Sequence, residues 1–231
     1  MSRSEHNLAH LELVADALDG LLHEVTFVGG CTTVLLVDEA ALSGVRHTED
    51  VDVIVDVATY RQYMAFSKKL RQLGFAEAQG GPICRWNKNT GETEIKLDVM
   101  PVSEQILGFS NRWYGDAMVN AELKTLPSGV EIRVVSPGYF LATKFEAFQG
   151  RGGGDYAASH DLEDIVFLLE NRTDLIKELI DYPAELKRYI ADQANDLLNE
   201  KFLNILPGLV MGPYGKDTVE NYLKLISTWS H

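Results

Sequence analysis

Cysteine and positive charge are scarce in this sequence, and long apolar runs are absent. The two cysteines, Cys31 and Cys84, provide neither a disulfide framework nor a zinc-ligand spacing. No apolar run approaches the ~20 residues needed to span a bilayer. The first residues carry acids and histidines where a signal peptide needs an uninterrupted apolar segment. We therefore expect a protein of the reducing cytoplasm with no membrane association.

The shortage of positive charge bears on the partners of the protein. Lys and Arg number 21 against 34 Asp and Glu, which gives a formal net charge of −13. Proteins that bind nucleic acid nonspecifically usually have a basic excess, because they neutralise phosphates. An RNA partner would therefore need a local basic patch, whereas a small nucleotide bridged by a metal ion to carboxylates would not.

Hydrophobic periodicity predicts an α+β protein of 231 residues. Strands are predicted at 25–28, 51–57, 83–86, 93–100, 122–126 and 130–135. Helices are predicted at 7–22, from 32–37, and at 60–73, 137–149, 160–169, 172–180, 184–205 and 217–228, with a loop at 105–113. We expect an α/β core at residues 1–135, with a mixed sheet and flanking helices, and a helical C-terminal region at 136–231.

Two aspartates, Asp50 and Asp52, begin the strand predicted at 51–57. Side chains alternate between the faces of a strand, so these two carboxylates share one face. Like charges this close repel each other, and a hard divalent cation such as Mg²⁺ relieves the repulsion. The alternative is the polar face of an edge strand.

A glycine pair, Gly29-Gly30, follows the predicted strand at 25–28. Glycine lets the backbone approach a phosphate without a Cβ in the way. We expect a helix to begin after the pair, with its N-terminus favouring an anionic group and with Thr32 and Thr33 adding hydroxyl donors. An ordinary tight turn followed by helix-capping threonines is the alternative.

A third aspartate, Asp98, lies near the end of the strand at 93–100. It alternates with apolar residues and therefore lies on the polar face, just before Pro101. The strands at 83–86 and 93–100 form a plausible hairpin around residues 87–91. A solvent-exposed aspartate with no catalytic role is the alternative.

The strand, glycine turn and Asp-x-Asp strand resemble the nucleotidyltransferase superfamily. Within it, the segment Arg46-His47-Thr48-Glu49-Asp50-Val51-Asp52 is most similar to the AbiEii-type family, the toxin components of bacterial toxin–antitoxin and phage-resistance systems. The resemblance implies Mg²⁺ or Mn²⁺ on the first two aspartates, with Asp98 completing a second metal site or acting as the base. It implies nucleotide binding by Gly29, Gly30, Thr32, Thr33, Arg46, Thr48 and Lys144. Arg46 could instead merely offset the charge of the aspartates.

The resemblance continues to about residue 169. Leu141-Ala142-Thr143-Lys144 resembles the lysine helix of the family, and His160-Asp161-Leu162-Glu163-Asp164 resembles its Arg/Lys-Asp-x-x-Asp motif, with a histidine replacing the cation. The implied roles are Lys144 on the triphosphate and Asp161 positioning Lys144 or the nucleotide. A structural Lys–Asp pair between packed helices is the alternative. His160 is a metal ligand or, more simply, a solvated capping residue.

These features predict a metal-dependent nucleotidyltransferase with a nucleoside triphosphate as substrate. The resemblance implies a toxin-like role, with tRNA or a protein as acceptor and a cognate antitoxin as partner. Two alternatives remain: a nucleotide- or metal-binding module without turnover, and an enzyme that modifies a small molecule such as an aminoglycoside. We also expect the glycine-rich loop at 150–154 to be mobile and to settle over bound nucleotide, with Arg151 reaching a phosphate.

Overall fold

The computed structural model describes residues 2–91, 93–150 and 156–230, and these form two compact units. The sheet unit comprises Met1–Leu35 and Arg46–Ser136, and the helical unit comprises Leu36–Val45 and Pro137–His231. The chain passes from the sheet unit to the helical unit after Leu35, returns after Val45 and passes again after Ser136. The segment Leu36–Val45, which the sequence analysis assigned to the core at 1–135, instead packs with the helical unit.

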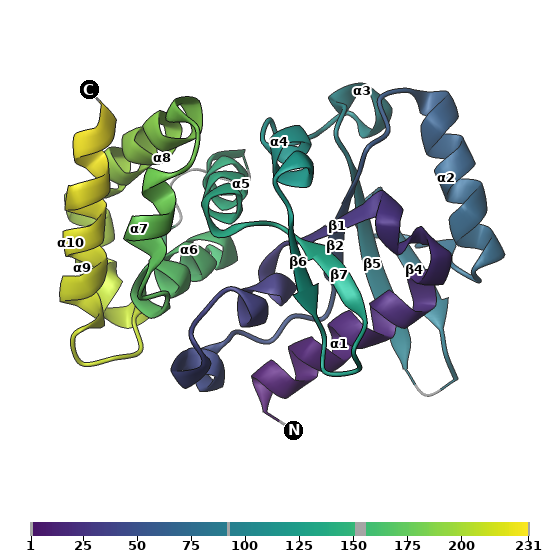
Figure 1. Ribbon diagram of the computed structural model, residues 1–231, viewed down its shortest axis with the longest axis horizontal. Coiled ribbons are helices and arrows are strands. Elements are labelled where there is room, and N and C mark those ends of the chain that lie inside the picture. Colours follow the sequence, from purple (N-terminus) through teal and green to yellow (C-terminus); the bar gives the residue numbers. More distant parts are fainter. Residues whose placement is uncertain (1, 92, 151–155, 231) are drawn as a thin grey trace. The chain divides into compact units, whose positions relative to one another are not determined.

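The sheet unit has an α+β architecture built on one mixed sheet (Figure 1). In the described residues the strands lie in the order β3-β4-β5-β2-β1-β7-β6. The strands are β1 (Val25–Val28), β2 (Val51–Val55), β3 (Ala76–Glu77), β4 (Arg85–Asn89), β5 (Glu94–Pro101), β6 (Glu122–Thr125) and β7 (Glu131–Val134). The helices are α1 (Arg3–Leu18), α2 (Tyr60–Gln72), α3 (Glu104–Leu107) and α4 (Tyr114–Val119), with 3₁₀ segments η1 (Asp19–Glu24) and η2 (Gly30–Leu35).

The core of this unit lies along the central strands. All four residues of β1 are buried, and β2 is buried from Val53 to Val55. β2 runs antiparallel to β1 and parallel to β5, and α1 packs against β2 and β5. Because both of its neighbours are strands, β2 is a central strand, and the edge-strand alternative for the Asp-x-Asp motif is wrong.

Two segments of this unit have a different secondary structure from the one predicted. The helix expected from 32–37 is the short 3₁₀ segment η2, in which three consecutive β-branched residues (Thr32, Thr33, Val34) disfavour an α-helix. A six-residue 3₁₀ segment lacks the aligned dipole of a long α-helix, so the helix-dipole argument for a phosphate there does not hold. The loop expected at 105–113 contains most of α3.

The helical unit is built from six α-helices in the described residues. They are α5 (Pro137–Gly150), α6 (His160–Asn171), α7 (Leu175–Ile180), α8 (Ala184–Leu197), α9 (Glu200–Leu209) and α10 (Gly215–Ser227), with 3₁₀ segments η3 (Glu39–Gly44) and η4 (Thr228–Ser230). α5 packs against α6, α7 and α8, and α10 packs against α6 and α8. Ser159 is the N-cap of α6, because its side chain accepts a hydrogen bond from the Leu162 amide.

The helix expected at 184–205 is two helices. Asn199 separates them, and its side chain accepts a hydrogen bond from the Phe202 amide as the N-cap of α9. Pro207 lies inside α9 rather than ending the preceding helix. The mobile loop predicted at 150–154 begins at Gly150, which is the last residue of α5. Its other residues, 151–154 with Arg151 among them, lie outside the described residues. Among the helices that the structure describes, none has both the length and the apolarity to cross a membrane.

Candidate active site

The centre of the candidate site is a pair of aspartates on adjacent parallel strands. Asp52 of β2 and Asp98 of β5 are direct partners in the strand register, so their side chains leave the sheet on the same face. The side chain of Asp98 is only 7% exposed. The structure therefore brings together the two carboxylates that the sequence placed on polar strand faces, with Asp98 too buried to be an ordinary surface aspartate.

The third predicted carboxylate, Asp50, lies one residue before β2 and is joined to the pair through Arg85. Arg85 donates from Nε to Oδ1 of Asp98 at 2.8 Å and from Nη2 to Oδ2 of Asp98 at 2.8 Å, and Nη2 also donates to Oδ2 of Asp50. Hydrogen bonding to Asp98 raises the pKa of Arg85, against an opposing effect of burial. Arg85 was not among the predicted site residues. It lies in the hairpin as the register partner of Asp98, a pairing that the predicted strand ranges did not give.

Gly29 directly follows β1 and brings its backbone against Asp52. Its φ of +75° is in the left-handed region that favours glycine. A Cβ at this position would lie 1.9 Å from Oδ2 of Asp52. The glycine of the turn is thus required both by its own backbone conformation and by the carboxylate seated against it.

We expect Gly29→Ala to lower the free energy of unfolding by about 3 kcal/mol, because it adds left-handed backbone strain and a steric clash with Asp52. Gly129 is a matched control, with a φ of +87° and open space around its Cβ position. Gly129→Ala should therefore lose only the backbone part, about 1 kcal/mol. Chemical denaturation of both variants measures the difference. Equal losses would show that the close approach of Gly29 to Asp52 contributes nothing to the loss of stability in Gly29→Ala.

Thr32 and Thr48, two other predicted nucleotide-binding residues of the sheet unit, make structural hydrogen bonds. The Thr32 hydroxyl donates to the Gly29 carbonyl at 2.8 Å, whereas the neighbouring Thr33 hydroxyl is buried without a hydrogen-bond partner among the described residues. Thr48 is buried, and its amide and hydroxyl donate to Oδ1 of Asn7 at 3.2 and 3.4 Å. These contacts stabilise the turn and the entry to β2, and a role in binding phosphate stays a prediction for these residues.

Arg46 and Gly30 also lie next to this turn region. Asn7 donates to the Arg46 carbonyl at 2.8 Å, and the Arg46 guanidinium donates to the His47 carbonyl at 3.4 Å. Gly30 is buried at the start of η2. Contact of either residue with a nucleotide also stays a prediction.

Neither cysteine is suited to nucleophilic chemistry. Burial raises the pKa of both Cys31 and Cys84 to about 12. Both thiols are therefore protonated at neutral pH, and the chemistry of the site rests on its carboxylates.

The helical unit contains the second predicted cluster, around Lys144 in α5. Its ammonium lies 3.0 Å from Oδ1 of Asp161 and 2.7 Å from Oδ2 of Asp164, both in α6. All three side chains are at least nine-tenths buried. Burial disfavours the charged ammonium, but the two carboxylates outweigh this effect and raise the pKa of Lys144. The Lys144–Asp161 contact inferred from the resemblance is present.

Asp164 belongs to this cluster but was not among the selected site residues. The signal was available, because residues three apart on a helix lie on the same face and Asp164 follows Asp161 by three. His160 does not join the cluster. Its side chain is 70% exposed, and its Nδ1 lies 2.9 Å from Oε2 of Glu163. These contacts agree with the alternative of a solvated residue rather than with that of a metal ligand.

The donor chemistry of the sheet unit fits a hard divalent cation, since Mg²⁺ and Mn²⁺ prefer carboxylate oxygens. In the part of the chain that the structure describes, no three His, Cys, Asp or Glu side chains are grouped as a metal site. The positive charge next to Asp50 and Asp98 is the guanidinium of Arg85. The site thus already accommodates a cation bound to carboxylate oxygens.

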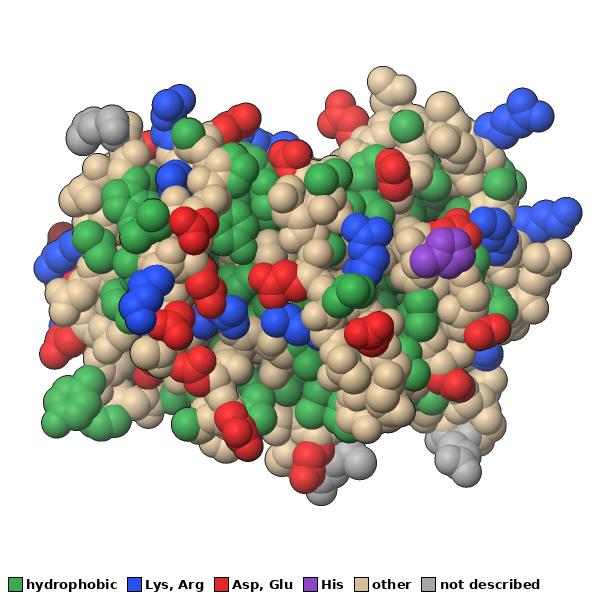
Figure 2. Space-filling view, in the orientation of Figure 1, with side chains coloured by type: hydrophobic (Ala, Val, Ile, Leu, Met, Phe, Trp, Pro, Cys, Tyr) green, Lys and Arg blue, Asp and Glu red, His purple; other side chains and the backbone are tan. Residues whose placement is uncertain are grey.

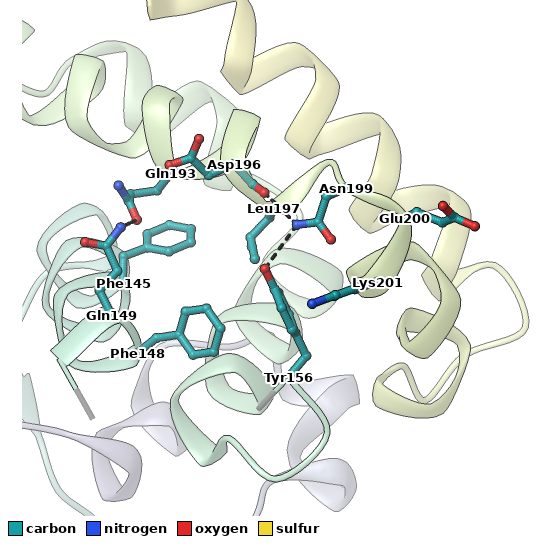
Figure 3. Close-up of a pocket in the computed structure, with 10 residues that line it drawn as sticks. All are labelled: Phe145, Phe148, Gln149, Tyr156, Gln193, Asp196, Leu197, Asn199, Glu200 and Lys201. Carbon is teal, nitrogen blue, oxygen red and sulfur yellow. Dashed lines mark hydrogen bonds between the residues drawn. The ribbon is translucent and has the colours of Figure 1, made fainter. Parts of the chain in front are cut away.

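A separate cavity of about 630 Å³ lies in the helical unit (Figure 3). The aromatic rings of Phe148 and Tyr156 lie on one side of it, and the Gln149 amide donates to Gln193 on the other. The lining residues are Phe145, Phe148, Gln149, Tyr156, Gln193, Asp196, Leu197, Asn199, Glu200 and Lys201. None belongs to either charged cluster, so the cavity is distinct from the residues predicted to carry the chemistry.

Comparison with known proteins identifies a similar fold and a matching family. The crystal structure of an antigenic nucleotidyltransferase-like protein from Paracoccidioides brasiliensis has a similar fold, with a TM-score of 0.54 at 17% sequence identity, covering 91% of this chain and 95% of that chain. No curated protein matches the sequence. The family model described as nucleotidyl transferase AbiEii toxin, type IV toxin–antitoxin system, matches residues 13–213. The match spans both units, and the chain belongs to the AbiEii nucleotidyl transferase toxin family.

Proposed function

We propose that this protein is a metal-dependent nucleotidyltransferase that moves a nucleoside monophosphate from a nucleoside triphosphate to an acceptor. The observation that carries the proposal is the register pairing of Asp52 with Asp98 on adjacent parallel strands, beside the turn at Gly29. Two carboxylates held this close on one sheet face are suited to binding a divalent cation. A site with a purely structural role does not require two neighbouring carboxylates.

Each residue of the site has a defined part in the proposal. Asp50 and Asp52 would hold Mg²⁺ or Mn²⁺, and Asp98 would complete a second metal site or accept the proton of the attacking hydroxyl. When bound, the metal supplies charge stabilisation to the phosphate oxygens. Gly29 allows the backbone to come close to the carboxylates and to the phosphates. Lys144, positioned by Asp161, contacts the triphosphate.

The reaction forms one bond and breaks one. An acceptor hydroxyl oxygen attacks the α-phosphorus in line with the leaving group, and the bond from that phosphorus to the bridging oxygen breaks. Pyrophosphate leaves with the bonding electron pair, and the hydroxyl proton passes to a carboxylate or to water. Because little covalent chemistry is required of the protein, position and charge dominate catalysis.

We propose tRNA or a protein as the acceptor, a cognate antitoxin as the partner, and the cytoplasm as the location, where nucleoside triphosphates are available. The family assignment supports the antitoxin. The face of the molecule drawn in Figure 2 does not suggest nonspecific binding of nucleic acid. Figure 2 shows acidic side chains scattered among the Lys and Arg side chains on one face of the molecule. An RNA acceptor would thus be selected by shape and a few local contacts rather than by a broad basic surface.

Transfer of label from nucleoside triphosphates tests the proposal directly. Each of the four α-³²P-labelled triphosphates is incubated with the protein, Mg²⁺ or Mn²⁺, and separate RNA, protein and small-molecule fractions of a cell extract. We expect label in the RNA or protein fraction and none when EDTA is added. Label confined to small molecules would indicate an antibiotic-modifying type of enzyme. Binding of triphosphate without transfer to any fraction would indicate a module without turnover.

A further inference from the structure

Arg85 is placed by the sheet register rather than by a flexible loop. It lies in β4 opposite Asp98 of β5, and Asp98 lies opposite Asp52 of β2. The three residues thus form a row across three neighbouring strands, on the face that carries the candidate site. The fork of the guanidinium donates to both oxygens of Asp98 and also to Asp50, two residues before Asp52.

The positive charge of Arg85 offsets the electrostatic repulsion among the three carboxylates. Three carboxylates on one face repel each other, and the penalty is largest for the buried Asp98. Arg85 is the cation best suited to this position, because its fixed fork matches a carboxylate with two parallel hydrogen bonds and it stays charged at any physiological pH. Its side chain is 21% exposed, so its ion pairs are only partly screened by solvent.

The same oxygens are the ones that a divalent ion would need. A dipositive ion beside the guanidinium would repel it at short distance, and each carboxylate oxygen has few lone pairs to share. We propose that Arg85 is a built-in counter-ion, which occupies Asp50 and Asp98 when the metal is absent, withdraws when a divalent ion binds, and so sets the metal affinity of the site. This inference rests on the proposed function, since it concerns the metal site assigned there.

A second cation on the same face provides a matched control. Lys96 lies in β5 two residues before Asp98, on the same strand face, and pairs with Oε2 of Glu49 at 2.7 Å. Its side chain is 32% exposed and that of Glu49 is 72% exposed. Removing the Lys96 charge takes one positive charge from the same strand face, as removing the Arg85 charge does, but leaves the contacts of Arg85 in place.

The test is a Mn²⁺ titration of the metal-free full-length protein, followed by electron paramagnetic resonance of the free ion. We expect Arg85→Gln to bind Mn²⁺ about tenfold more tightly than the wild type, because the competing cation is gone. Lys96→Gln should change the affinity by less than about twofold. The melting temperature of metal-free Arg85→Gln should fall by about 4 °C and recover when Mn²⁺ is added.

The outcomes separate this inference from the proposed function. If the wild type binds Mn²⁺ and Arg85→Gln binds it equally or more weakly, the counter-ion role is overturned. The proposed metal site is still supported in that case. An equal gain in Arg85→Gln and Lys96→Gln also overturns it, because general charge would then explain the effect. Absence of Mn²⁺ binding in both proteins overturns both proposals. If Arg85→Gln does not fold, Arg85→Lys decides, since lysine lacks the fork: a gain in Mn²⁺ affinity supports the inference and no gain refutes it.

Discussion

Replacing Asp52 with asparagine is expected to lower the rate of nucleotidyl transfer at least about a hundredfold while leaving the protein folded. The substitution keeps the size of the side chain but removes the charge that the site presents beside Asp98. The free energy of unfolding without metal should hold or rise slightly, because removing one of two neighbouring carboxylates relieves repulsion. Transfer of labelled nucleotide and thermal melting in EDTA measure the two effects separately.

Asp56 offers a matched control for this variant. It follows β2 directly, is exposed, and lies four positions after Asp52. Asp56→Asn removes the same charge from the same stretch of chain, so we expect transfer and melting temperature close to those of the wild type. A large loss of stability in Asp52→Asn, or an equal loss of transfer in both variants, would mean that Asp52 is structural.

The alternation of side chains in strands was sufficient to predict that Asp52 and Asp98 each lie on the polar face of their own strand. The period of two is strict, so the face of a residue follows from its position in the strand. Alternation cannot say which strands are neighbours, however, and β2 and β5 are separated in sequence by α2, β3 and β4. The predicted meeting of the two carboxylates therefore depended on the family resemblance rather than on periodicity.

The contact of Arg85 with Asp98 could not be predicted from the strand ranges alone. We expected the first strand of the hairpin at 83–86, whereas β4 runs from Arg85 to Asn89. A shift of one residue in the pairing would move Arg85 to the opposite face, because register and face are coupled in a sheet. The register depends on the geometry of the turn, which this sequence does not specify strongly.

The packing of Leu36–Val45 with the helical unit depends on contacts distant in sequence. Asp38 donates from its amide to the Asn171 carbonyl at 2.9 Å, and its side chain accepts from the Thr173 amide at 3.0 Å. Hydrogen bonds between residues more than 130 positions apart leave no periodic signal in either segment. The sequence analysis therefore had no basis for separating this segment from the core at 1–135.

Replacing Lys144 with methionine is expected to lower the free energy of unfolding by about 3–5 kcal/mol. The reason is the charge that remains rather than the contact that is lost. Without the ammonium, Asp161 and Asp164 would be two buried carboxylates with no cation between them. Urea denaturation measures the loss. A change below about 1 kcal/mol would mean that solvent reaches the cluster and that its burial carries little energy.

An exposed ion pair in the same unit provides the control for this variant. Lys224 lies 2.6 Å from Oε1 of Glu220, one turn away on α10, and its side chain is 58% exposed. Lys224→Met removes an identical charge and an identical side chain, and should change the free energy of unfolding by no more than about 0.5 kcal/mol. The contrast between the two lysines isolates the effect of burial.

A compensated variant then separates the structural role of Lys144 from its proposed role on the triphosphate. In Lys144→Met combined with Asp161→Asn and Asp164→Asn, no uncompensated charge remains, and most of the lost stability should return. If Lys144 contacts the nucleotide, this stable variant should still transfer label at least about a hundredfold more slowly than the wild type. Recovery of transfer together with stability would show that the buried cluster only holds α5 against α6. Loss of transfer in a fully stable protein would assign the cluster to the chemistry of the enzyme.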